Sequence, residues 1–251
     1  MKILVTFAVD AEFAPWRGLR LFRRIDTGMG AEAYQADING SQVCVLLTGI
    51  GGDKAWVEAT KLIWNLDVDM CISSGLAAGL RAEHVLGEVV VARQVEAASQ
   101  KRTIECDVEM VALARRCGAK GVQLMYSTDH VVISAIEKNE LGKVADVVDM
   151  ESGDILYEAV AFGARVVAIR AVSDSSQEDL PIDFNRVVTK EGDVSIPRVL
   201  GEVARRPSVL PSLVRFGKQS RAAAEKLAGV LDRYVEHLAA FNSVSADKAA
   251  L

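Results

Sequence analysis

Apolar and polar positions follow two periods along the first two thirds of the chain. Short runs rich in β-branched residues predict strands buried on both faces. These runs lie at 2–9, 42–49, 68–75, 87–97, 122–128, 144–150 and 165–172. Apolar residues spaced three and four apart predict helices, at 53–66, 109–117 and 152–163. The repeated strand–helix order favours one α/β domain with a central mixed, largely parallel β-sheet flanked by α-helices.

The clearest unit runs from Val144 to Ser176 and reads as strand, helix and strand, with Gly163 where a C-cap glycine belongs. Two strands joined by a helix form a βαβ unit, in which the strands are parallel. We therefore expect Glu151 and Asp174, each directly after a strand, at the same carboxyl edge of the sheet. Ligands bind at this edge in open α/β sheets, so the two acids mark a candidate site.

The last third of the chain differs from the rest in its pattern of apolar and polar residues. A polar loop follows Ser176, and the apolar spacing of 194–206 and 211–241 predicts two helices. This helical region, 194–241, interleaves apolar residues with arginines. It predicts either a cover for one face of the sheet or a surface that contacts a membrane or a lipid-like substrate. We expect a single domain over 1–241 and a disordered tail over 242–251.

Composition and charge narrow the function classes. The net charge of −5 in 251 residues argues against a nucleic-acid partner. The four cysteines lack C-x-x-C spacing and favour buried thiols in a reducing cytosol. The first apolar run ends at Asp10 and predicts a strand rather than a signal peptide. No run approaches the ~18 apolar residues of a membrane span, so we expect a cytoplasmic protein.

Carboxylates also follow the first strand, at Asp10 and Glu12. An isolated acid after a strand is most often a helix cap or a solvated residue, but a parallel sheet would bring Glu12 beside Glu151 and Asp174. Crowded carboxylates raise one another's pKa, so one can act as an acid while another acts as a base. Such oxygens could also bind Mg²⁺. They come from separate loops without D-x-D spacing, and no His/Cys cluster indicates zinc, so no metal site is expected.

Two glycine-rich turns keep a dinucleotide-binding oxidoreductase open as an alternative. The turn at 48–55 follows a strand and opens a helix, but Lys54 stands where the dinucleotide fingerprint needs Gly or Ala. The turn at 28–33 fits G-x-G-x-x-A better, although no convincing strand precedes it. Small residues at 73–79 would let a ligand approach the backbone closely. His130, just after a strand, is expected to be a polar surface histidine or to line the pocket.

Taken in order, these motifs resemble the nucleoside phosphorylase/nucleosidase superfamily, and within it the methylthioadenosine/S-adenosylhomocysteine nucleosidase branch. The matching segments lie at 7–12, 48–51, 73–80, 87–91, 148–151 and 171–174. The last third, at 180–186 and 205–224, looks like the hopanoid-associated phosphorylase subgroup, thought to remove adenine from adenosylhopane. The resemblance implies a nucleoside phosphorylase-like fold, a homo-oligomer and no cofactor, with phosphate as co-substrate only in a phosphorylase.

The resemblance also implies roles for single residues. Glu12 would activate a water, and Asp174 would protonate or hydrogen-bond N7 of the purine. Glu151 would hold the ribose hydroxyls, with Met150 packed against the sugar. The other substrate-binding residues are expected to be Asp149, Ile50, Gly75, Ala77, Ala78, Val131 and Val132. These roles suit the chemistry, because an acid relieves charge on the leaving purine and a carboxylate stabilises the oxocarbenium ion.

The choice between water and phosphate depends on charge. Phosphate is a dianion that needs arginine or backbone donors, and an ionised Glu12 would repel it. Arg93 or the Arg23/Arg24 pair could offset this repulsion. The sequence thus favours hydrolytic cleavage of the N-glycosidic bond of a purine nucleoside with an apolar 5′ substituent. The alternatives are phosphorolysis of adenosylhopane in hopanoid biosynthesis, the oxidoreductase, and a non-catalytic nucleoside-binding module.

Overall fold

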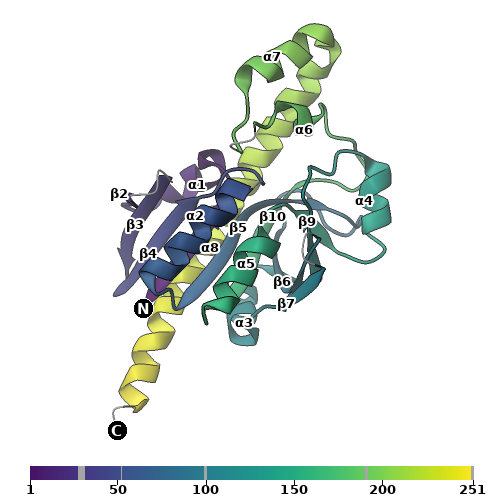
Figure 1. Ribbon diagram of the computed structural model, residues 1–251. Helices are drawn as coiled ribbons and strands as arrows, with labels where there is room; N and C mark the ends of the chain where they lie inside the picture. The colour runs from purple at the N-terminus through teal and green to yellow at the C-terminus, as the bar shows by residue number, and fades with distance from the viewer. Residues whose placement is uncertain (28–31, 52, 99–100, 190–191, 250–251) are drawn as a thin grey trace.

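The computed structural model describes residues 1–27, 32–51, 53–98, 101–189 and 192–249, and a ten-stranded mixed sheet forms its centre (Figure 1). The strands are β1 (Lys2–Phe7), β2 (Arg23–Asp26), β3 (Glu32–Ile38), β4 (Ser41–Leu47), β5 (Met70–Gly79), β6 (Val89–Ala97), β7 (Arg102–Glu105), β8 (Lys120–Ser127), β9 (Val147–Asp149) and β10 (Arg165–Asp174). Their order is β10-β6-β8-β9-β5-β1-β4-β3-β2, with β7 on β6. Because β10 also pairs with β5, the strands β5, β10, β6, β8 and β9 close into a small barrel.

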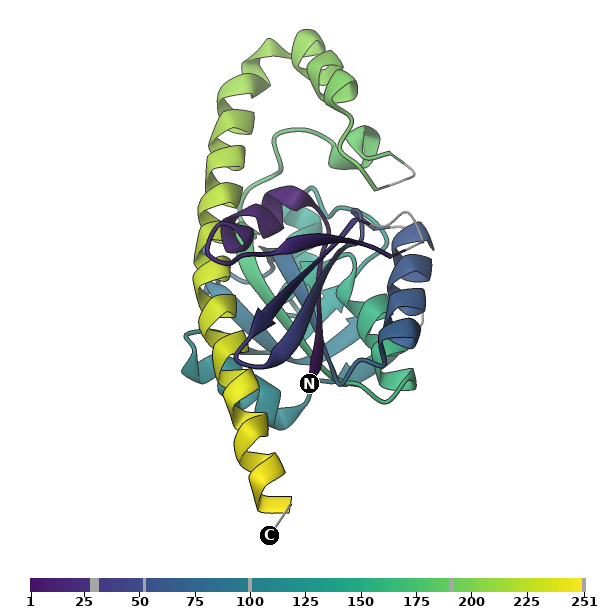
Figure 2. The ribbon, with the colours of Figure 1, turned by 90° about the vertical axis from the view of Figure 1, so that its left-hand side faces the viewer.

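Helices cover both faces of this sheet. They are α1 (Asp10–Arg17), α2 (Asp53–Leu66), α3 (Val108–Arg116), α4 (Ala135–Leu141), α5 (Ser152–Ala161), α6 (Phe184–Val187), α7 (Ile196–Arg205) and α8 (Leu210–Ala249), with a 3-10 turn at Pro207–Val209. The helices α2 and α5 lie on one face, and the long α8 runs along the other (Figures 1 and 2). Helix α7 and the first turns of α8 project beyond the end of the sheet (Figure 2).

Strand directions differ from the prediction. β1, β4, β5 and β10 are parallel, whereas β6, β8 and β9 run the opposite way. The prediction of parallel strands on either side of α5 is therefore wrong, since β9 pairs antiparallel with the end of β5 at Ala78 and Val148. The sheet is mixed, but not largely parallel. Apolar runs report that a strand is buried and carry no information on its direction, which here follows from closure of the barrel.

The core explains why these segments form these elements. Eight of the ten residues of β10 are buried, as the continuous apolar run predicted. Asp107 caps α3 by accepting from the backbone N–H groups of Glu109 and Met110, a contact worth about 1 kcal/mol. In α8, one face is buried against the sheet and α1, which confirms the prediction that this helix covers a sheet face. The buried residues of that face are Ala223, Ala224, Leu227, Ala228, Val230, Leu231, Tyr234, Val235 and Leu238.

The sequence also led to predictions about the C-terminal tail, the cysteines and membrane-spanning segments. Helix α8 continues to Ala249, so the disordered tail predicted for 242–251 is not observed over 242–249. All four cysteines are free and buried, as predicted, and burial raises the pKa of Cys44 and of Cys71 to about 12. Among the described residues, no helix is long and apolar enough to cross a membrane.

Candidate active site

A cavity of about 1160 Å³ opens at the end of the sheet where β1, β5 and β10 end. Its lining reaches from acidic side chains near the sheet to apolar side chains under α7 and α8. It brings together every predicted catalytic and substrate-binding residue except Gly75. These residues are Glu12, Ile50, Ala77, Ala78, Val131, Val132, Asp149, Met150, Glu151 and Asp174.

Helix α1 holds Glu12 at the cavity. Phe13 and Trp16, both fully buried, fix the other side of this helix. The Phe13 ring lies 5.6 Å from that of Phe7, and Trp16 Nε1 donates to Asp232 Oδ1 of α8 at 3.1 Å. Truncation of such an aromatic costs about 3–5 kcal/mol. Helix α1 was not predicted from the sequence, yet its buried aromatic face decides where Glu12 points.

The Glu12 carboxylate is held by backbone donors. Ala8 N donates to its Oε2 and Leu76 N donates to its Oε1, each at 3.1 Å. Burial raises the pKa of Glu12 above its ordinary value, while the Arg170 charge and these N–H groups oppose the rise. Gly75 has a φ of +137°, and a Cβ there would stand 2.7 Å from Glu12 Oε2. Gly75 therefore supports Glu12 from behind rather than lining the cavity.

Glu151 and Asp149 share a buried arginine that sequence reasoning missed. Arg170 of β10 is 1% exposed, and its Nη2 lies 2.6 Å from Asp149 Oδ2 and 3.5 Å from Glu151 Oε2. Burial raises the pKa of Glu151 to about 7; Arg170 lowers it, and the neighbouring Asp149 and Glu12 raise it further. A carboxyl group whose pKa is near 7 is partly protonated at neutral pH, so it can both accept and donate hydrogen bonds, as the hydroxyl groups of a sugar require.

Asp174 at the end of β10 has a second missed cation. Lys138 of α4 is fully buried, and its Nζ donates to Asp174 Oδ2 at 2.6 Å and to the carbonyls of Ser175 and Glu178 at 3.1 and 3.0 Å. Ser173 Oγ donates to Asp174 Oδ1 at 2.6 Å. The β10 register shifts between Val172 and Asp174, and such irregularities re-aim a side chain at a strand end. Each oxygen of Asp174 thus has a fixed donor.

The glycine turn after β4 acts through its backbone. Gly51 N donates to Glu151 Oε1 at 3.1 Å, and a Cβ on Gly51 would stand 2.9 Å from Met150 Cε. Ile50 N donates to Gly192 O at 2.8 Å, so Gly192 lies against the turn after β4. This contact with Glu151 replaces the dinucleotide interpretation of the turn at 48–55. The other glycine turn, at 28–31, lies outside the described residues.

The far end of the cavity is apolar. The rings of Phe184 and Phe216 lie 5.3 Å apart, which joins α6 to α8. Asn185 exchanges hydrogen bonds with the backbone of Val131, so the loop after β10 is tied to the loop after β8. The apolar residues of this end, here called the apolar chamber, are Leu180, Phe184, Val188, Val194, Ile196, Val199, Leu213 and Phe216.

The arginines proposed for phosphate lie elsewhere. Arg93 is exposed on β6 and does not line the cavity, so its prediction as a phosphate ligand is wrong. Arg23 and Arg24 are exposed on β2 and are also absent from the lining. The side chain on β6 points away because residues along a strand alternate between faces. His130 lines the cavity at its mouth with its side chain 47% exposed, between Asp129 and Glu137.

The acidic end of the cavity does not suit a metal ion. Glu12 and Glu151 already accept from backbone N–H groups, Asp174 accepts from Lys138, and Arg170 forms an ion pair with Glu151. A divalent cation there would face two buried protein cations, Arg170 and Lys138, whose charges would repel it. The arrangement instead suits a neutral molecule that gains positive charge during reaction, because fixed carboxylates stabilise such charge in a water-poor site.

Comparison with known proteins agrees with this geometry. The family model described as "Phosphorylase superfamily" matches residues 2–236. The 5′-methylthioadenosine/S-adenosylhomocysteine nucleosidase of Shewanella halifaxensis is 25% identical over 224 residues, covering 80% of this chain and 97% of the relative. That of an Exiguobacterium species is 25% identical over 218 residues, covering 74% of this chain and 90% of the relative.

Solved structures share the fold. The nucleosidase of Campylobacter jejuni superposes with a TM-score of 0.72 at 15% identity, covering 94% of this chain and 99% of that one. The futalosine hydrolase of Helicobacter pylori gives a TM-score of 0.67 at 19% identity, covering 92% of this chain and 97% of the other. The family match spans both the barrel and the acidic end of the cavity. The chain belongs to the phosphorylase superfamily.

Proposed function

We propose that this protein hydrolyses the N-glycosidic bond of an adenosine-type purine nucleoside and releases the base. The observation that carries the proposal is the convergence of Glu12, Glu151 and Asp174 on one cavity, each with a different set of partners. The relatives named as methylthioadenosine nucleosidases match along nearly their whole length, which supports the same reaction class.

The proposed reaction divides the work between the carboxylates. Glu12 takes a proton from water as the water oxygen bonds to the sugar carbon, and the bond from that carbon to the purine breaks. The electron pair of the broken bond passes to the base, and Asp174 hydrogen-bonds or protonates N7 of the purine. Glu151 holds the sugar hydroxyls beside Met150. General acid and base steps each contribute about 10²–10⁴-fold, so both ends of the breaking bond need their carboxylate.

Charge supports water as the nucleophile. Within the described part of the cavity wall and its backing, Arg170, Lys138 and Arg221 each pair with a carboxylate. At Arg170 or Lys138, phosphate would have to displace a buried ion pair, which costs Coulomb and desolvation energy. The Arg221–Glu225 pair is exposed and weak, so there the repulsion by an ionised Glu12 is the remaining obstacle. Phosphorolysis remains the alternative, and it would need a cation other than the arginines named from the sequence.

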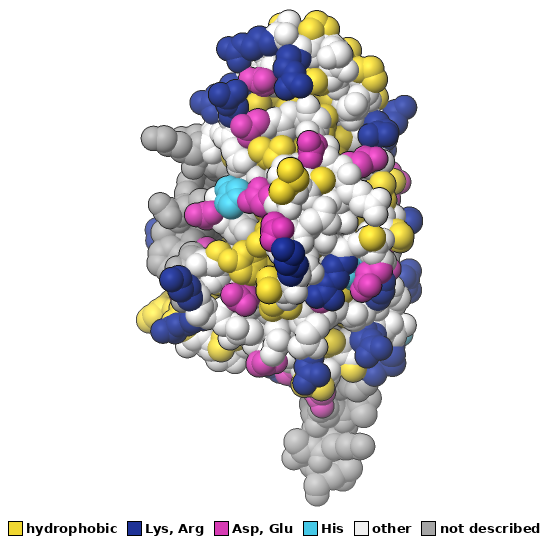
Figure 3. Space-filling model, turned by 90° about the vertical axis from the view of Figure 1, so that its right-hand side faces the viewer, with side chains coloured by type: hydrophobic (Ala, Val, Ile, Leu, Met, Phe, Trp, Pro, Cys, Tyr) yellow, Lys and Arg dark blue, Asp and Glu magenta, His cyan; other side chains and the backbone are white. Residues whose placement is uncertain are grey.

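The apolar chamber supports a nucleoside with a large apolar 5′ substituent. A methylthio group would fill little of a cavity this size, and burying apolar surface contributes roughly 25 cal/mol per Å². A hopanoid-like group, as in adenosylhopane, is the candidate that the sequence resemblance implies. Figure 3 shows Lys and Arg beside hydrophobic side chains at the end where α7 lies. Exposed Ile196 and Leu200, beside Arg198, support contact of this end with a lipid surface.

Homo-oligomerisation is supported by a second exposed apolar area. Trp64 of α2 is 69% exposed and Phe162 after α5 is 40% exposed, with their rings 5.1 Å apart. Exposed aromatic residues of this kind are enriched in interfaces between protein chains. Sedimentation of the wild type and of Trp64→Ser would test this patch. The cytoplasmic location stays a prediction of the sequence.

The decisive experiment measures adenine release from two substrates, with and without phosphate. One substrate is methylthioadenosine, and the other carries a long alkyl chain at the 5′ position. We expect release of adenine without phosphate. At low substrate concentration, release from the long-chain substrate should be faster than release from methylthioadenosine. Release that requires phosphate and yields a sugar 1-phosphate would make this protein a phosphorylase. Thermal stabilisation by either nucleoside without any release would identify a binding module.

A further inference from the structure

We propose that Glu83, His84 and Asp146 form a binding site for a divalent transition metal such as Zn²⁺. None of the three lines the cavity described above. Glu83 and His84 belong to the loop between β5 and β6, and Asp146 directly precedes β9. The metal would therefore join two segments that approach each other only in the folded chain.

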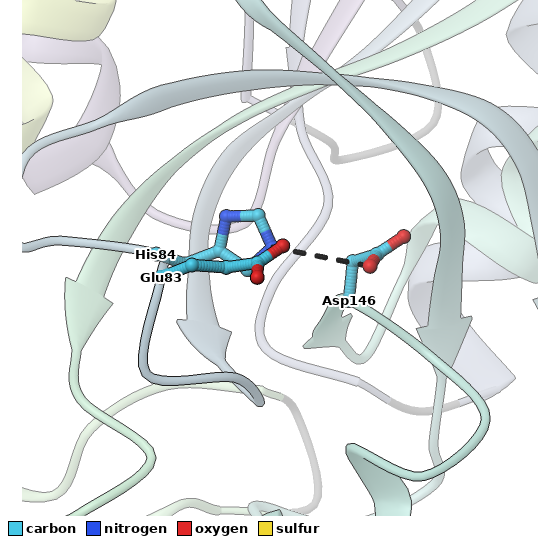
Figure 4. Close-up of side chains that lie close together, drawn as sticks. All are labelled: Glu83, His84 and Asp146. Atoms are coloured by element: carbon cyan, nitrogen blue, oxygen red, sulfur yellow. Dashed lines mark ion pairs between the residues drawn. The ribbon is translucent and has the colours of Figure 1, made fainter.

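Their ligand atoms already face one another. His84 Nε2 lies 3.9 Å from Glu83 Oε1 and 3.9 Å from Asp146 Oδ1. One ligand atom of each residue lies within 4.8 Å of the others. Figure 4 shows Glu83 and His84 side by side on one loop, with Asp146 facing them. Imidazole and carboxylate groups are both zinc ligands, and three protein ligands leave the fourth tetrahedral position to water.

The histidine is oriented as a metal ligand should be. Its Nδ1 lies 2.9 Å from Glu88 Oε2, and since an ionised carboxylate only accepts, Nδ1 carries the hydrogen. The lone pair of the neutral ring is then on Nε2. This atom is buried, in a side chain 2% exposed, and has no hydrogen-bond partner among the described residues. A carboxylate that fixes the other ring nitrogen is the usual support of metal-ligating histidines.

Asp146 is equally fixed. Its Oδ2 accepts from the backbone N–H groups of Gln123 and Leu124 at 2.8 and 2.9 Å, which leaves Oδ1 facing His84. Arg81 also contacts Oδ1, at 2.9 Å, but a carboxylate oxygen has two lone pairs. Ligands at ~2.0–2.2 Å from a tetrahedral zinc lie roughly 3.3–3.5 Å apart. Both 3.9 Å separations must therefore close by about half an ångström. Glu83, whose side chain is 66% exposed, can move toward His84, whereas closing the gap between His84 and Asp146 requires the loop between β5 and β6 to shift.

Charge also fits a divalent cation. Glu83, Asp146 and Glu88 supply three negative charges. Arg81 pairs with Asp146 and Lys120 pairs with Glu88, so the cluster without a metal carries a net charge of −1 and attracts a cation. Without a metal, a protonated His84 would carry an Nε2–H group 3.9 Å from both carboxylates, which is beyond hydrogen-bond distance. A metal would bind the lone pair of Nε2, whereas a proton on Nε2 would have no acceptor within hydrogen-bond distance.

The position of the site couples it to the catalytic strand. A Cβ on Gly79 would stand 3.4 Å from both His84 Cβ and the Asp174 carbonyl. The same loop exchanges backbone hydrogen bonds with Val172, through Gly87 and Glu88. A metal bound here would hold the loop against the end of β10, from which Asp174 enters the cavity.

The chain contains a matched control. His130 lies between Asp129 and Glu137, so it offers the same three residue types. Both of its ring nitrogens already lie 2.8 Å from a carboxylate oxygen, and its side chain is 47% exposed. If a histidine with two nearby acids were enough for metal binding, both clusters would bind equally. The difference lies in the open, buried Nε2 of His84.

The test is equilibrium dialysis of the full chain against Zn²⁺, combined with NMR of its ¹⁵N-labelled histidines. We expect one zinc per chain, with the first equivalent shifting the His84 ring nitrogens. His84→Gln should weaken this binding more than about 10-fold, and Glu88→Gln about 10–100-fold, as for other supports of a metal ligand. His130→Gln should leave it unchanged.

Glu83→Gln keeps the experiment informative if His84→Gln fails to fold, because Glu83 is exposed. It should also weaken binding more than about 10-fold, with the unfolding temperature of the zinc-free protein retained. The proposal is overturned if His84→Gln or Glu83→Gln binds zinc like the wild type. It is also overturned if the first equivalent shifts His130 or His237, or if no zinc binds at all.

Discussion

The two ends of the cavity are built in opposite ways. At the acidic end, Glu151, Asp149 and Arg170 stand on or beside strands of the closed barrel and are almost fully buried. At the other end, the apolar chamber is formed by α6, α7 and the start of α8, which project beyond the sheet (Figure 2). No residue of α7 is buried. The acidic end is enclosed by the protein core, whereas the apolar chamber is formed by helices that project from it.

This difference indicates that the acidic end carries out the reaction and that the apolar chamber selects the substrate. Catalytic carboxylates need their geometry held to a fraction of an ångström, which strands, bulges and buried ion pairs supply. An apolar substituent needs only matching surface, since hydrophobic burial is not directional. Changes at the acidic end should therefore act on turnover, and changes in the apolar chamber should act on which substrate binds.

The largest effect is expected at the acidic end. Asp174→Asn and Glu12→Gln should each lower kcat more than about 100-fold, because each removes a proton-transfer group while keeping its shape. Substrate affinity should be largely retained, as measured by ligand titration of the inactive variants. A 4-nitrophenyl riboside, whose leaving group needs no protonation, should recover much of the loss in Asp174→Asn and none in Glu12→Gln. Near-normal turnover in either variant would contradict the assignment.

Lys138→Met should lower kcat about 10-fold or more with little change in KM. The methionine fits the buried site by length but leaves Asp174 without one of its two donors. If Lys138 is a positioning residue for Asp174, Lys138→Arg should restore part of the activity, and the 4-nitrophenyl riboside should be cleaved normally. Lys143→Met is the control, since Lys143 pairs with Glu140 at the surface. Equal loss on both substrates would indicate a purely structural role.

The apolar chamber offers the complementary test. Phe216→Ser should raise KM for the nucleoside with a long 5′ chain by roughly 10-fold, because it removes apolar surface from the wall that would contact the chain. Turnover of methylthioadenosine should change by less than about 2-fold, since Phe216 is an apolar side chain of α8 and takes part in no proton transfer. Steady-state kinetics on both substrates measure the split. An equal change for the two substrates would remove the distinction between the ends.

The smallest effect is a change of stability with pH. Burial raises the folded-state pKa of Glu151 to about 7, against 4.5 for the free side chain. Between these values the folded chain binds more protons than the unfolded chain, so the contribution of Glu151 to the free energy of unfolding falls as pH rises. Glu151→Gln lacks this dependence. Urea unfolding should show the variant gaining on the wild type from pH 4.5 to 7, and a constant difference would contradict the raised pKa.

The sequence by itself determined seven of the ten strands, five of the eight α-helices and the acids that follow the strands. Periodicity reports burial, and burial in an α/β domain follows from the local pattern of β-branched and apolar residues. Glu12, Glu151 and Asp174 were correctly predicted to share one cavity, but the parallel β9 and β10 on which the prediction for Glu151 depended are antiparallel, and closure of the barrel brings Glu151 there instead. The strands β2, β3 and β7 and the helices α1, α4 and α6 were missed. The short β2 and α1 lack an apolar period.

Only the tertiary structure decided which cations meet these acids. Arg170 lies in the apolar run of β10, and this charge within a buried strand was the one available signal, since a buried arginine requires acidic partners. Lys138 stands in a polar stretch that gave no signal, whereas Arg93 looked suitable and points away from the cavity. The pairing of His84 with Asp146 likewise spans separate segments. Partners across the fold depend on strand order and barrel closure, and neither is written in the local periodicity of the chain.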